Sequence, residues 1–218
     1  MKMFNFITKQ ICLAGALALV FVAASGFKAD PTDDFSFSYA RSPVVDGYKL
    51  MSANKIEAIL SDRLDLFPDS QAGKLARHLV TLCKRYRFDP AFVLSLIEVE
   101  SSFRVSVISP AGAIGLMQLM PETAAIVAKW YNIKYSGGRA LVDPFTNLSL
   151  GIAYLSYLRD KYRELSPYFH IAAYNIGPAR LDELLARKYF KPTKTKKYYE
   201  AIKQGVPVLR YFRSRQSV

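Results

Sequence analysis

Two glutamates near the end of an apolar segment are the side chains best placed for acid–base chemistry. Residues three, four and seven apart share one face of a helix. The face of Glu100 carries Ile97, Leu96 and Val93. The face of Glu98 carries the more polar set Ser95, Leu94 and Ala91. Apolar surroundings raise the pKa of a carboxyl group, so the sequence favours Glu100 as a general acid.

A glycine-rich loop, Ser109–Pro121, follows this segment. Glycine permits close backbone approach and conformations closed to other residues. Gln118 is polar among apolar neighbours, so it bonds either to a ligand or to the backbone, and we favour the ligand. Met117 and Met120 either fill the core or line a binding site, and Met120 is the better candidate for the binding site.

Helical patterns that begin at proline dominate the second part of the chain. Asp89-Pro90 and Asp143-Pro144 are typical N-caps with proline in the first turn, and Gly177 is typical of a helix end. Convincing strand alternation is absent. We therefore predict a mainly α domain over residues 67–213. The expected helices are 71–86, 90–101, 121–131, 144–163, 167–175, 178–187 and 195–204, with a short one near 56–66.

Two small residues add detail to this pattern. Gly151 lies inside the expected helix 144–163, where glycine costs about 1 kcal/mol relative to alanine. We expect a close helix or ligand contact there. Cys83 lies in an apolar helical stretch and is expected in the core.

The N-terminus has the layout of a leader segment. Lys2 and Lys9 precede an apolar or small run, Ile11–Phe27. This pattern is typical of a secretory signal, and a cleaved signal is favoured over an uncleaved membrane anchor. We assign 1–26 to the signal peptide or anchor and 27–66 to a tether with little regular structure. The expected location is the periplasm, with membrane association if the leader is retained.

The cysteines and histidines predict neither a disulfide nor a metal site. One of the two cysteines, Cys12, lies inside the leader, which leaves a single thiol. The two histidines, His78 and His170, belong to no cluster with ligand spacing. We expect no metal and no cofactor.

The net charge of +12 and the pI of about 9.7 indicate an anionic partner. Hydrophobic residues make up 51% of the chain, so a sizeable core is expected. A basic, aromatic stretch over 187–199 has the composition of a nucleic-acid surface. An exported protein seldom meets nucleic acid, so we expect none and favour a cell-wall polymer or anionic lipid.

Four motifs in order resemble the lytic transglycosylase SLT domain, a lysozyme-like family that cleaves the glycan strands of peptidoglycan. The likeness covers about residues 75–205. The motifs are Glu100-Ser101-x-Phe103, Ser109-Pro110-x-Gly112-Ala113-x-Gly115-Leu116-Met117-Gln118-Leu119-Met120-Pro121, Asp143-Pro144-x-x-Asn147-x-x-x-Gly151 and Ala173-Tyr174-Asn175-x-Gly177-Pro178.

This resemblance implies a role for six residues. Glu100 matches the single catalytic acid/base, and Ser101 the serine that positions it or the substrate. Gln118 and Met120 match residues that line the sugar-binding cleft. Tyr174 and Asn175 match the pair beside the catalytic carboxyl group.

The stretch Lys194–Tyr199 departs from the family pattern. Many relatives have Glu-Thr-Arg there, so the preference of this chain for substrate peptides is in doubt.

Glycoside cleavage normally uses two carboxylates, and the sequence offers one clear candidate. Asp143 is interpreted as a helix cap and Glu122 as a first-turn residue favoured by the helix dipole. The resemblance implies that the substrate's 2-acetamido group assists Glu100 and that a 1,6-anhydro ring closes without water. A goose-type-lysozyme-like hydrolase and an inactive peptidoglycan-binding scaffold of an envelope machine remain the alternatives.

Overall fold

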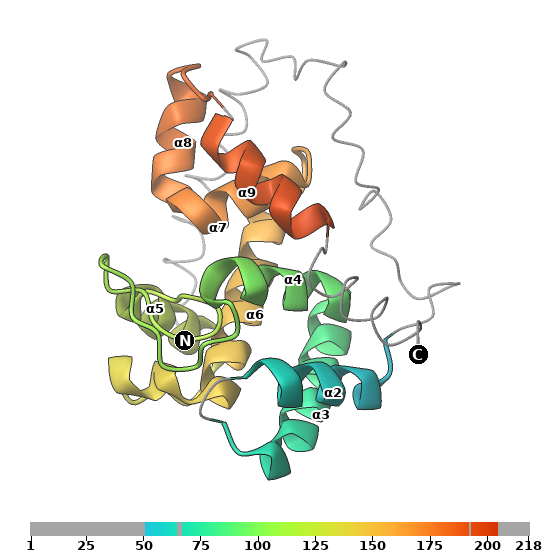
Figure 1. Cartoon of the computed structure of the whole chain (residues 1–218). Coiled ribbons are helices and arrows are strands. Elements are labelled where there is room, and N and C mark those ends of the chain that lie inside the picture. Colours follow the sequence, from blue (N-terminus) through green and yellow to red (C-terminus); the bar gives the residue numbers. More distant parts are fainter. Residues whose placement is uncertain (1–50, 65–66, 192, 205–218) are drawn as a thin grey trace. The chain divides into compact units, whose positions relative to one another are not determined.

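The computed structural model describes residues 51–64, 67–191 and 193–204 (Figure 1). Within these residues the chain divides into two compact units. One unit is Leu158–Lys197, and the other takes the described residues before Leu158 and after Lys197. The expected leader, most of the expected tether and residues 205–213 lie outside the described residues.

Helices make up the regular structure of the described part, which confirms the mainly α class. The larger unit holds α2 (Ala53–Arg63), α3 (Asp69–Tyr86), α4 (Pro90–Ser101), α5 (Pro121–Tyr131), the 3-10 helix η1 (Gly138–Val142), most of α6 (Pro144–Lys161) and most of α9 (Thr193–Gln204). The smaller unit holds α7 (Tyr168–Ile176) and α8 (Pro178–Ala186). The helix expected near 56–66 is α2, and η1 was not predicted.

Local capping chemistry sets the start of two of these helices. The Asp89 carboxylate accepts a hydrogen bond from the Ala91 amide at 2.8 Å, and Pro90 occupies the first turn of α4. The Asp143 carboxylate accepts from the Thr146 amide at 2.9 Å and from its hydroxyl at 2.6 Å. Both Asp-Pro pairs are therefore helix caps, as the sequence predicts.

α4 is the core helix of the larger unit. All its residues from Phe92 to Ile97 are buried, so it packs on several sides rather than along one stripe. α2 packs against α3, and α3 against α4 (Figure 1). Cys83 of α3 is buried, which confirms its expected place in the core.

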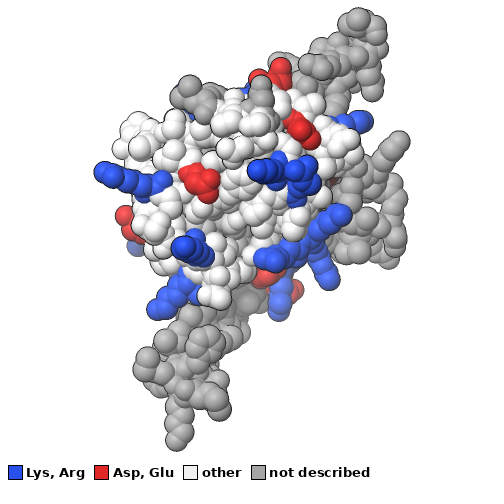
Figure 2. All heavy atoms as spheres, turned by 90° about the horizontal axis from the view of Figure 1, so that it is seen from below, with Lys and Arg blue, Asp and Glu red and all other residues white. Residues whose placement is uncertain are grey.

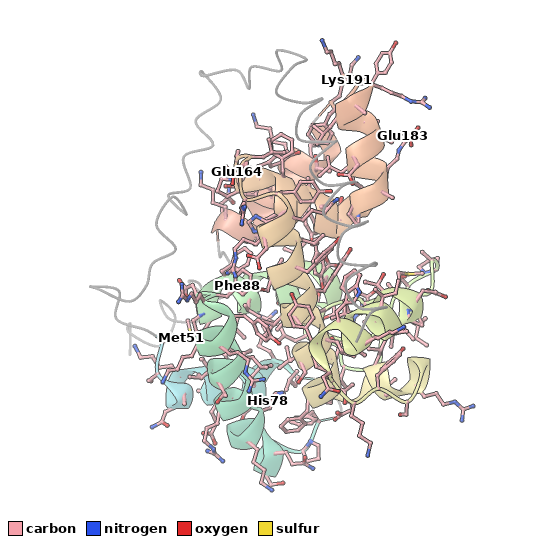
Figure 3. All side chains as sticks on the ribbon, turned by 180° about the vertical axis from the view of Figure 1, so that it is seen from behind. Met51, His78, Phe88, Glu164, Glu183 and Lys191 are labelled. Atoms are coloured by element: carbon pink, nitrogen blue, oxygen red, sulfur yellow. The ribbon has the colours of Figure 1, made fainter. Side chains whose placement is uncertain are left out.

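A histidine joins α3 to the start of α6. The Nε2 atom of His78, labelled in Figure 3, lies 2.8 Å from the Ser149 hydroxyl and 3.3 Å from the Phe145 carbonyl. Burial lowers the pKa of His78. The neutral imidazole can therefore share a hydrogen bond with α6 at neutral pH.

Within the described residues, no helix has both the length and the apolar character that a membrane span requires. The apolar run Ile11–Phe27 falls outside that part of the chain.

Candidate active site

Glu100 lies in the last turn of α4 and is half-buried. Burial raises the pKa of its carboxyl group from an ordinary value of 4.5 to about 7. A hydrogen bond from the Tyr198 hydroxyl to Oε1 acts in the opposite direction and is the smaller effect. The rise in pKa is the one predicted from the apolar face of the helix. At neutral pH this carboxyl group can both give and take a proton.

Tyr198 is the contact that sequence reasoning missed. It lies on α9, 98 residues from Glu100 along the chain, and donates to Oε1. The sequence around it predicts only a basic, aromatic surface. Because Oε1 of Glu100 accepts the Tyr198 hydroxyl, the proton that Glu100 exchanges is expected on Oε2. Tyr198 therefore orients the carboxyl group and stabilises its charged form.

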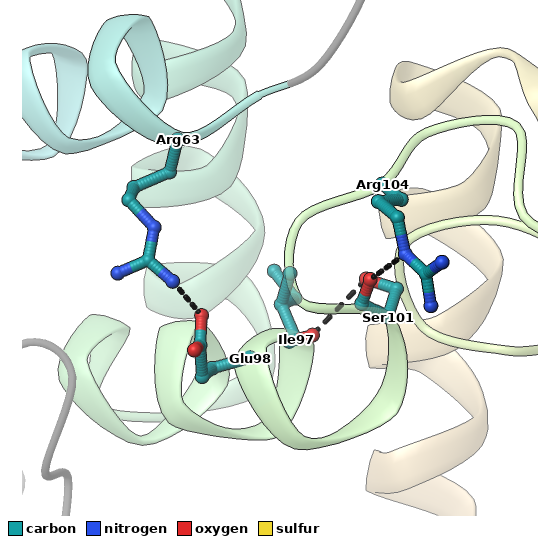
Figure 4. Close-up of polar contacts among 5 residues, drawn as sticks. All are labelled: Arg63, Ile97, Glu98, Ser101 and Arg104. Carbon is teal, nitrogen blue, oxygen red and sulfur yellow. Dashed lines mark hydrogen bonds and ion pairs between the residues drawn. The ribbon is translucent and has the colours of Figure 1, made fainter.

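The chain reverses directly after α4. Ser102 and Phe103 have φ of +51° and +63°, a left-handed conformation that costs about 1–2 kcal/mol per non-glycine residue. The Ser102 amide donates to the Glu98 carbonyl at 3.0 Å. Nε of Arg104 donates to the Ser101 carbonyl at 3.0 Å (Figure 4). These bonds fix the turn that follows Glu100.

Ser101 is placed inside the helix rather than toward a ligand. Its side chain is buried, and its hydroxyl donates to the Ile97 carbonyl at 3.0 Å (Figure 4). Such an i to i−4 bond satisfies the hydroxyl within its own helix. This favours positioning of the Glu100 turn over direct contact with a substrate.

Glu98 has a different environment from Glu100. Its Oε2 lies 2.5 Å from Nη2 of Arg63 in an ion pair that joins α4 to α2 (Figure 4). The guanidinium occupies this carboxylate, so Glu98 is less available than Glu100 for contact with a substrate. The structure thus supports the choice of Glu100 over Glu98.

A buried asparagine of α6 organises the glycine-rich loop. Oδ1 of Asn147 accepts from the Met117 amide at 2.8 Å, and Nδ2 donates to the Ile114 and Leu141 carbonyls, both at 2.9 Å. Gly115 has φ of +78°, and a Cβ there would lie 2.4 Å from both Nδ2 of Asn147 and the Leu141 carbonyl. This packing excludes any side chain at position 115.

The loop residues predicted to bind sugar have different surroundings. Nε2 of Gln118 donates to the Gly115 carbonyl at 2.9 Å and to the Val107 carbonyl at 3.2 Å. The amide nitrogen thus holds the loop backbone, contrary to the favoured ligand contact, and a sugar contact through the rest of Gln118 stays a prediction. Met120 is 36% exposed, which suits a contact surface. Its role also stays a prediction.

Met117 belongs to the core. It is fully buried, and a Cβ added at Gly151 of α6 would lie 2.4 Å from its sulfur. The close contact expected at Gly151 is therefore made by a methionine of the loop. Of the two interpretations of Met117, core packing is the one observed.

Tyr174 and Asn175 lie near the end of α7, in the smaller unit. Tyr174 is half-buried and Asn175 is exposed. Their expected place beside Glu100 stays a prediction.

Within the described ranges, His, Cys, Asp and Glu side chains form no group of three that could hold a metal ion. Three other carboxylates have structural partners: Asp89 and Asp143 cap helices, and Glu98 pairs with Arg63.

The buried carboxyl group makes folding stability depend on pH. Because the folded pKa of Glu100 lies above the unfolded value, its favourable contribution is complete below about pH 4.5 and is lost as pH rises through about 7. Glutamine carries no charge. We expect the stability of Glu100→Gln, relative to the parent chain, to increase by about 3 kcal/mol between pH 4 and pH 8.

Urea unfolding at the two pH values measures this difference. The parent chain, measured at the same two pH values, is the reference for this difference. A difference that stays the same at pH 4 and pH 8 would show that folding does not raise the pKa of Glu100.

Comparison with known proteins shows which protein family the chain resembles. The model of the transglycosylase SLT domain matches residues 81–197. The chain is 37% identical over 123 residues to the soluble lytic murein transglycosylase of Escherichia coli (strain K12), covering 50% of this chain and 19% of that protein. It is 38% identical over 104 residues to the membrane-bound lytic murein transglycosylase C of Actinobacillus pleuropneumoniae, covering 44% of this chain and 28% of that protein.

A solved structure agrees with the sequence matches. The 70 kDa soluble lytic transglycosylase from Escherichia coli aligns with a TM-score of 0.51 and 28% identity, covering 73% of this chain and 29% of that chain. The chain belongs to the transglycosylase SLT domain family, and its lysozyme-like fold class is confirmed. It spans less than a third of the length of these relatives.

Proposed function

We propose that this chain is a lytic transglycosylase of peptidoglycan. It cleaves the bond between N-acetylmuramic acid and N-acetylglucosamine and leaves 1,6-anhydro ends. The single observation that carries the proposal is a half-buried Glu100 whose pKa is raised to about 7 and whose Oε1 accepts from Tyr198. The family match and the names of the relatives support the reaction class.

Glu100 acts first as the acid and then as the base. Its proton passes to the glycosidic oxygen as the bond from the anomeric carbon to that oxygen breaks. The resulting carboxylate, stabilised by Tyr198, takes the proton of the 6-hydroxyl of the same sugar. That oxygen forms the new bond to the anomeric carbon, so the proton balance of Glu100 is restored and no water is consumed.

A site with one carboxylate needs help from the substrate. The 2-acetamido oxygen of the muramic acid can stabilise the oxocarbenium-like centre, as in glycosidases that lack a second carboxylate. Asp143 and Glu98 are held by Thr146 and Arg63, which supports this assignment. Met120, Gln118, Tyr174 and Asn175 are the proposed sugar contacts, and Ser101 positions Glu100.

The proposed setting is the periplasm, reached through the N-terminal segment, with membrane association if that segment is retained. On the face in Figure 2, Lys and Arg side chains are spread over the described part with Asp and Glu between them. A net charge of +12 favours attraction to the carboxylates of peptidoglycan peptides. We further propose that the chain can act together with a protein machine of the cell envelope. In this setting nucleic acid is not a proposed partner.

Mass spectrometry of the sugars released from purified peptidoglycan tests this function. A transglycosylase yields products lighter by one water than hydrolysed muropeptides and without a reducing end. Reducing muramic acid ends would identify a lysozyme-like hydrolase instead. Retained binding to the polymer with no release would identify a scaffold.

Replacing Tyr198 with phenylalanine should shift the pH dependence of cleavage. The hydroxyl lowers the pKa of Glu100, so its loss raises that pKa further, and the fall in rate on the alkaline side moves to higher pH. The pH profile of kcat measures the shift. Tyr189→Phe, at a mostly exposed tyrosine, is the control and should leave the profile in place. An unshifted profile for Tyr198→Phe would remove Tyr198 from the proposed site.

A further inference from the structure

Arg63 contacts both the last part of α4 and the turn that follows it. Its guanidinium pairs with the Glu98 carboxylate at 2.5 Å, and its Cζ lies 5.3 Å from the centroid of the Phe103 ring. The side chains of Arg63 and Glu98 are 30% and 20% exposed, so the ion pair is partly shielded from water. We call these two contacts the Arg63 clamp. Figure 4 shows its ion pair.

The clamp bridges the reversal that follows Glu100. Glu98, whose carbonyl accepts the Ser102 amide, stands at one end, and Phe103, 1% exposed, stands at the other. Ser102 and Phe103 both adopt the left-handed backbone conformation, which L-residues hold only when their surroundings enforce it. Arg63 therefore holds both ends of a strained turn, and Glu100 lies inside the segment it spans.

The clamp comes from a part of the chain beyond the family match. The SLT model begins at residue 81, whereas Arg63 is the last residue of α2, 35 residues before Glu98. α2 packs against α3, so Arg63 is presented from a helix with buried anchors at Ile56, Ile59 and Leu60. A planar guanidinium can pair with a carboxylate and cover an aromatic ring at once, which lysine does less well.

We propose that Arg63 is a positioning residue for the reaction: through Glu98 and Phe103 it fixes the last turn of α4 and with it the orientation of Glu100. This inference rests on the proposed function, in which Glu100 moves the proton. In this role Arg63 acts through its contacts with Glu98 and Phe103. Misplacement of a catalytic group by about 1 Å costs up to about 100-fold in rate. The clamp should therefore affect kcat more than substrate binding.

Four variants test the clamp: Arg63→Gln, Arg63→Lys, Glu98→Gln and the double variant Arg63→Gln/Glu98→Gln. For Arg63→Gln we expect kcat on purified peptidoglycan to fall about tenfold or more, with KM changed less than about twofold. Arg63→Lys should recover part of the rate, since it keeps the charge. The double variant should be no slower than the slower single variant, because both remove one interaction.

A measurement that does not depend on catalysis tests whether Arg63 holds the turn after α4. Hydrogen exchange of the Ser102 amide reports the opening of the turn, and it should become faster in Arg63→Gln. The matched control is Arg180→Gln, which breaks an exposed ion pair with Glu183 at 2.7 Å on α8 and should leave kcat and Ser102 exchange unchanged.

Two results would overturn the proposal: an unchanged kcat in Arg63→Gln, or a loss of rate that follows a lower melting temperature while Ser102 exchange stays the same. If the parent chain cleaves no glycan, the proposed function fails, and the positioning role fails with it. Ser102 exchange would still show whether Arg63 holds the turn, so the two failures are distinguishable.

Discussion

Replacing Glu100 with glutamine should reduce glycan cleavage by about a thousandfold or more. General acid–base catalysis contributes about 10²–10⁴ in rate, and in the proposed reaction one carboxyl group serves as acid and then as base. Glutamine keeps the shape and can still accept from Tyr198, but it can neither give nor take the proton. The measurement is the initial rate of release of soluble sugars from purified peptidoglycan.

Binding separates a chemical defect from a structural one. Glu100→Gln should still sediment with insoluble peptidoglycan, because the contacts to sugar come from other residues. Glu122→Gln, at an exposed carboxylate of α5, is the matched control and should cleave at close to the parent rate. If Glu100→Gln retained a tenth of the parent rate, Glu100 would not be the acid/base.

Features that depend on local chemistry could be predicted from the sequence. The Asp-Pro pairs at 89–90 and 143–144 are recognisable as helix caps because a cap needs only a carboxylate and an amide two or three residues further on. The direction of the Glu100 pKa shift is predicted from the apolar residues on its helix face, and burial is the main cause of the shift. Gly151 predicted a close contact because glycine inside a helix has a cost, although its partner, Met117, could not be named.

Features that depend on distant contacts could not be predicted. Tyr198 and Arg63 meet α4 across 98 and 35 residues, and neither has a local signal. The sequence leaves open whether Gln118 bonds to a ligand or to the backbone, and the structure shows its side-chain nitrogen bonded to the Gly115 carbonyl of the loop. A sugar contact through the rest of the side chain stays a prediction. Asn147 offers a partial clue to such contacts, because it is a polar residue beside Leu148 in a helix with many apolar residues.

Replacing Asn147 with alanine should destabilise the fold by about 3–5 kcal/mol. The side chain is fully buried and makes three hydrogen bonds to the backbone. Its loss removes all three bonds, although the Ile114 carbonyl still accepts from the Leu119 amide at 3.1 Å. A buried group that is left without a hydrogen bond costs about 1–3 kcal/mol, and the cavity adds to this. Urea unfolding of the parent chain and the variant measures the difference.

The same substitution should also disorder the loop that carries Met120, because Asn147 is the bridge from α6 to the loop and to η1. We therefore expect cleavage to fall even under conditions where Asn147→Ala is fully folded. Asn54→Ala, at an exposed position of α2, is the matched control and should be neutral or slightly stabilising, since alanine has the higher helix propensity. A melting temperature of Asn147→Ala within about 2 °C of the parent value would contradict a structural role for these three bonds.

Gly115→Ala is an independent check of the same junction. Its added Cβ would lie 2.4 Å from Nδ2 of Asn147 and from the Leu141 carbonyl, so it should weaken the junction without removing any hydrogen-bonding group.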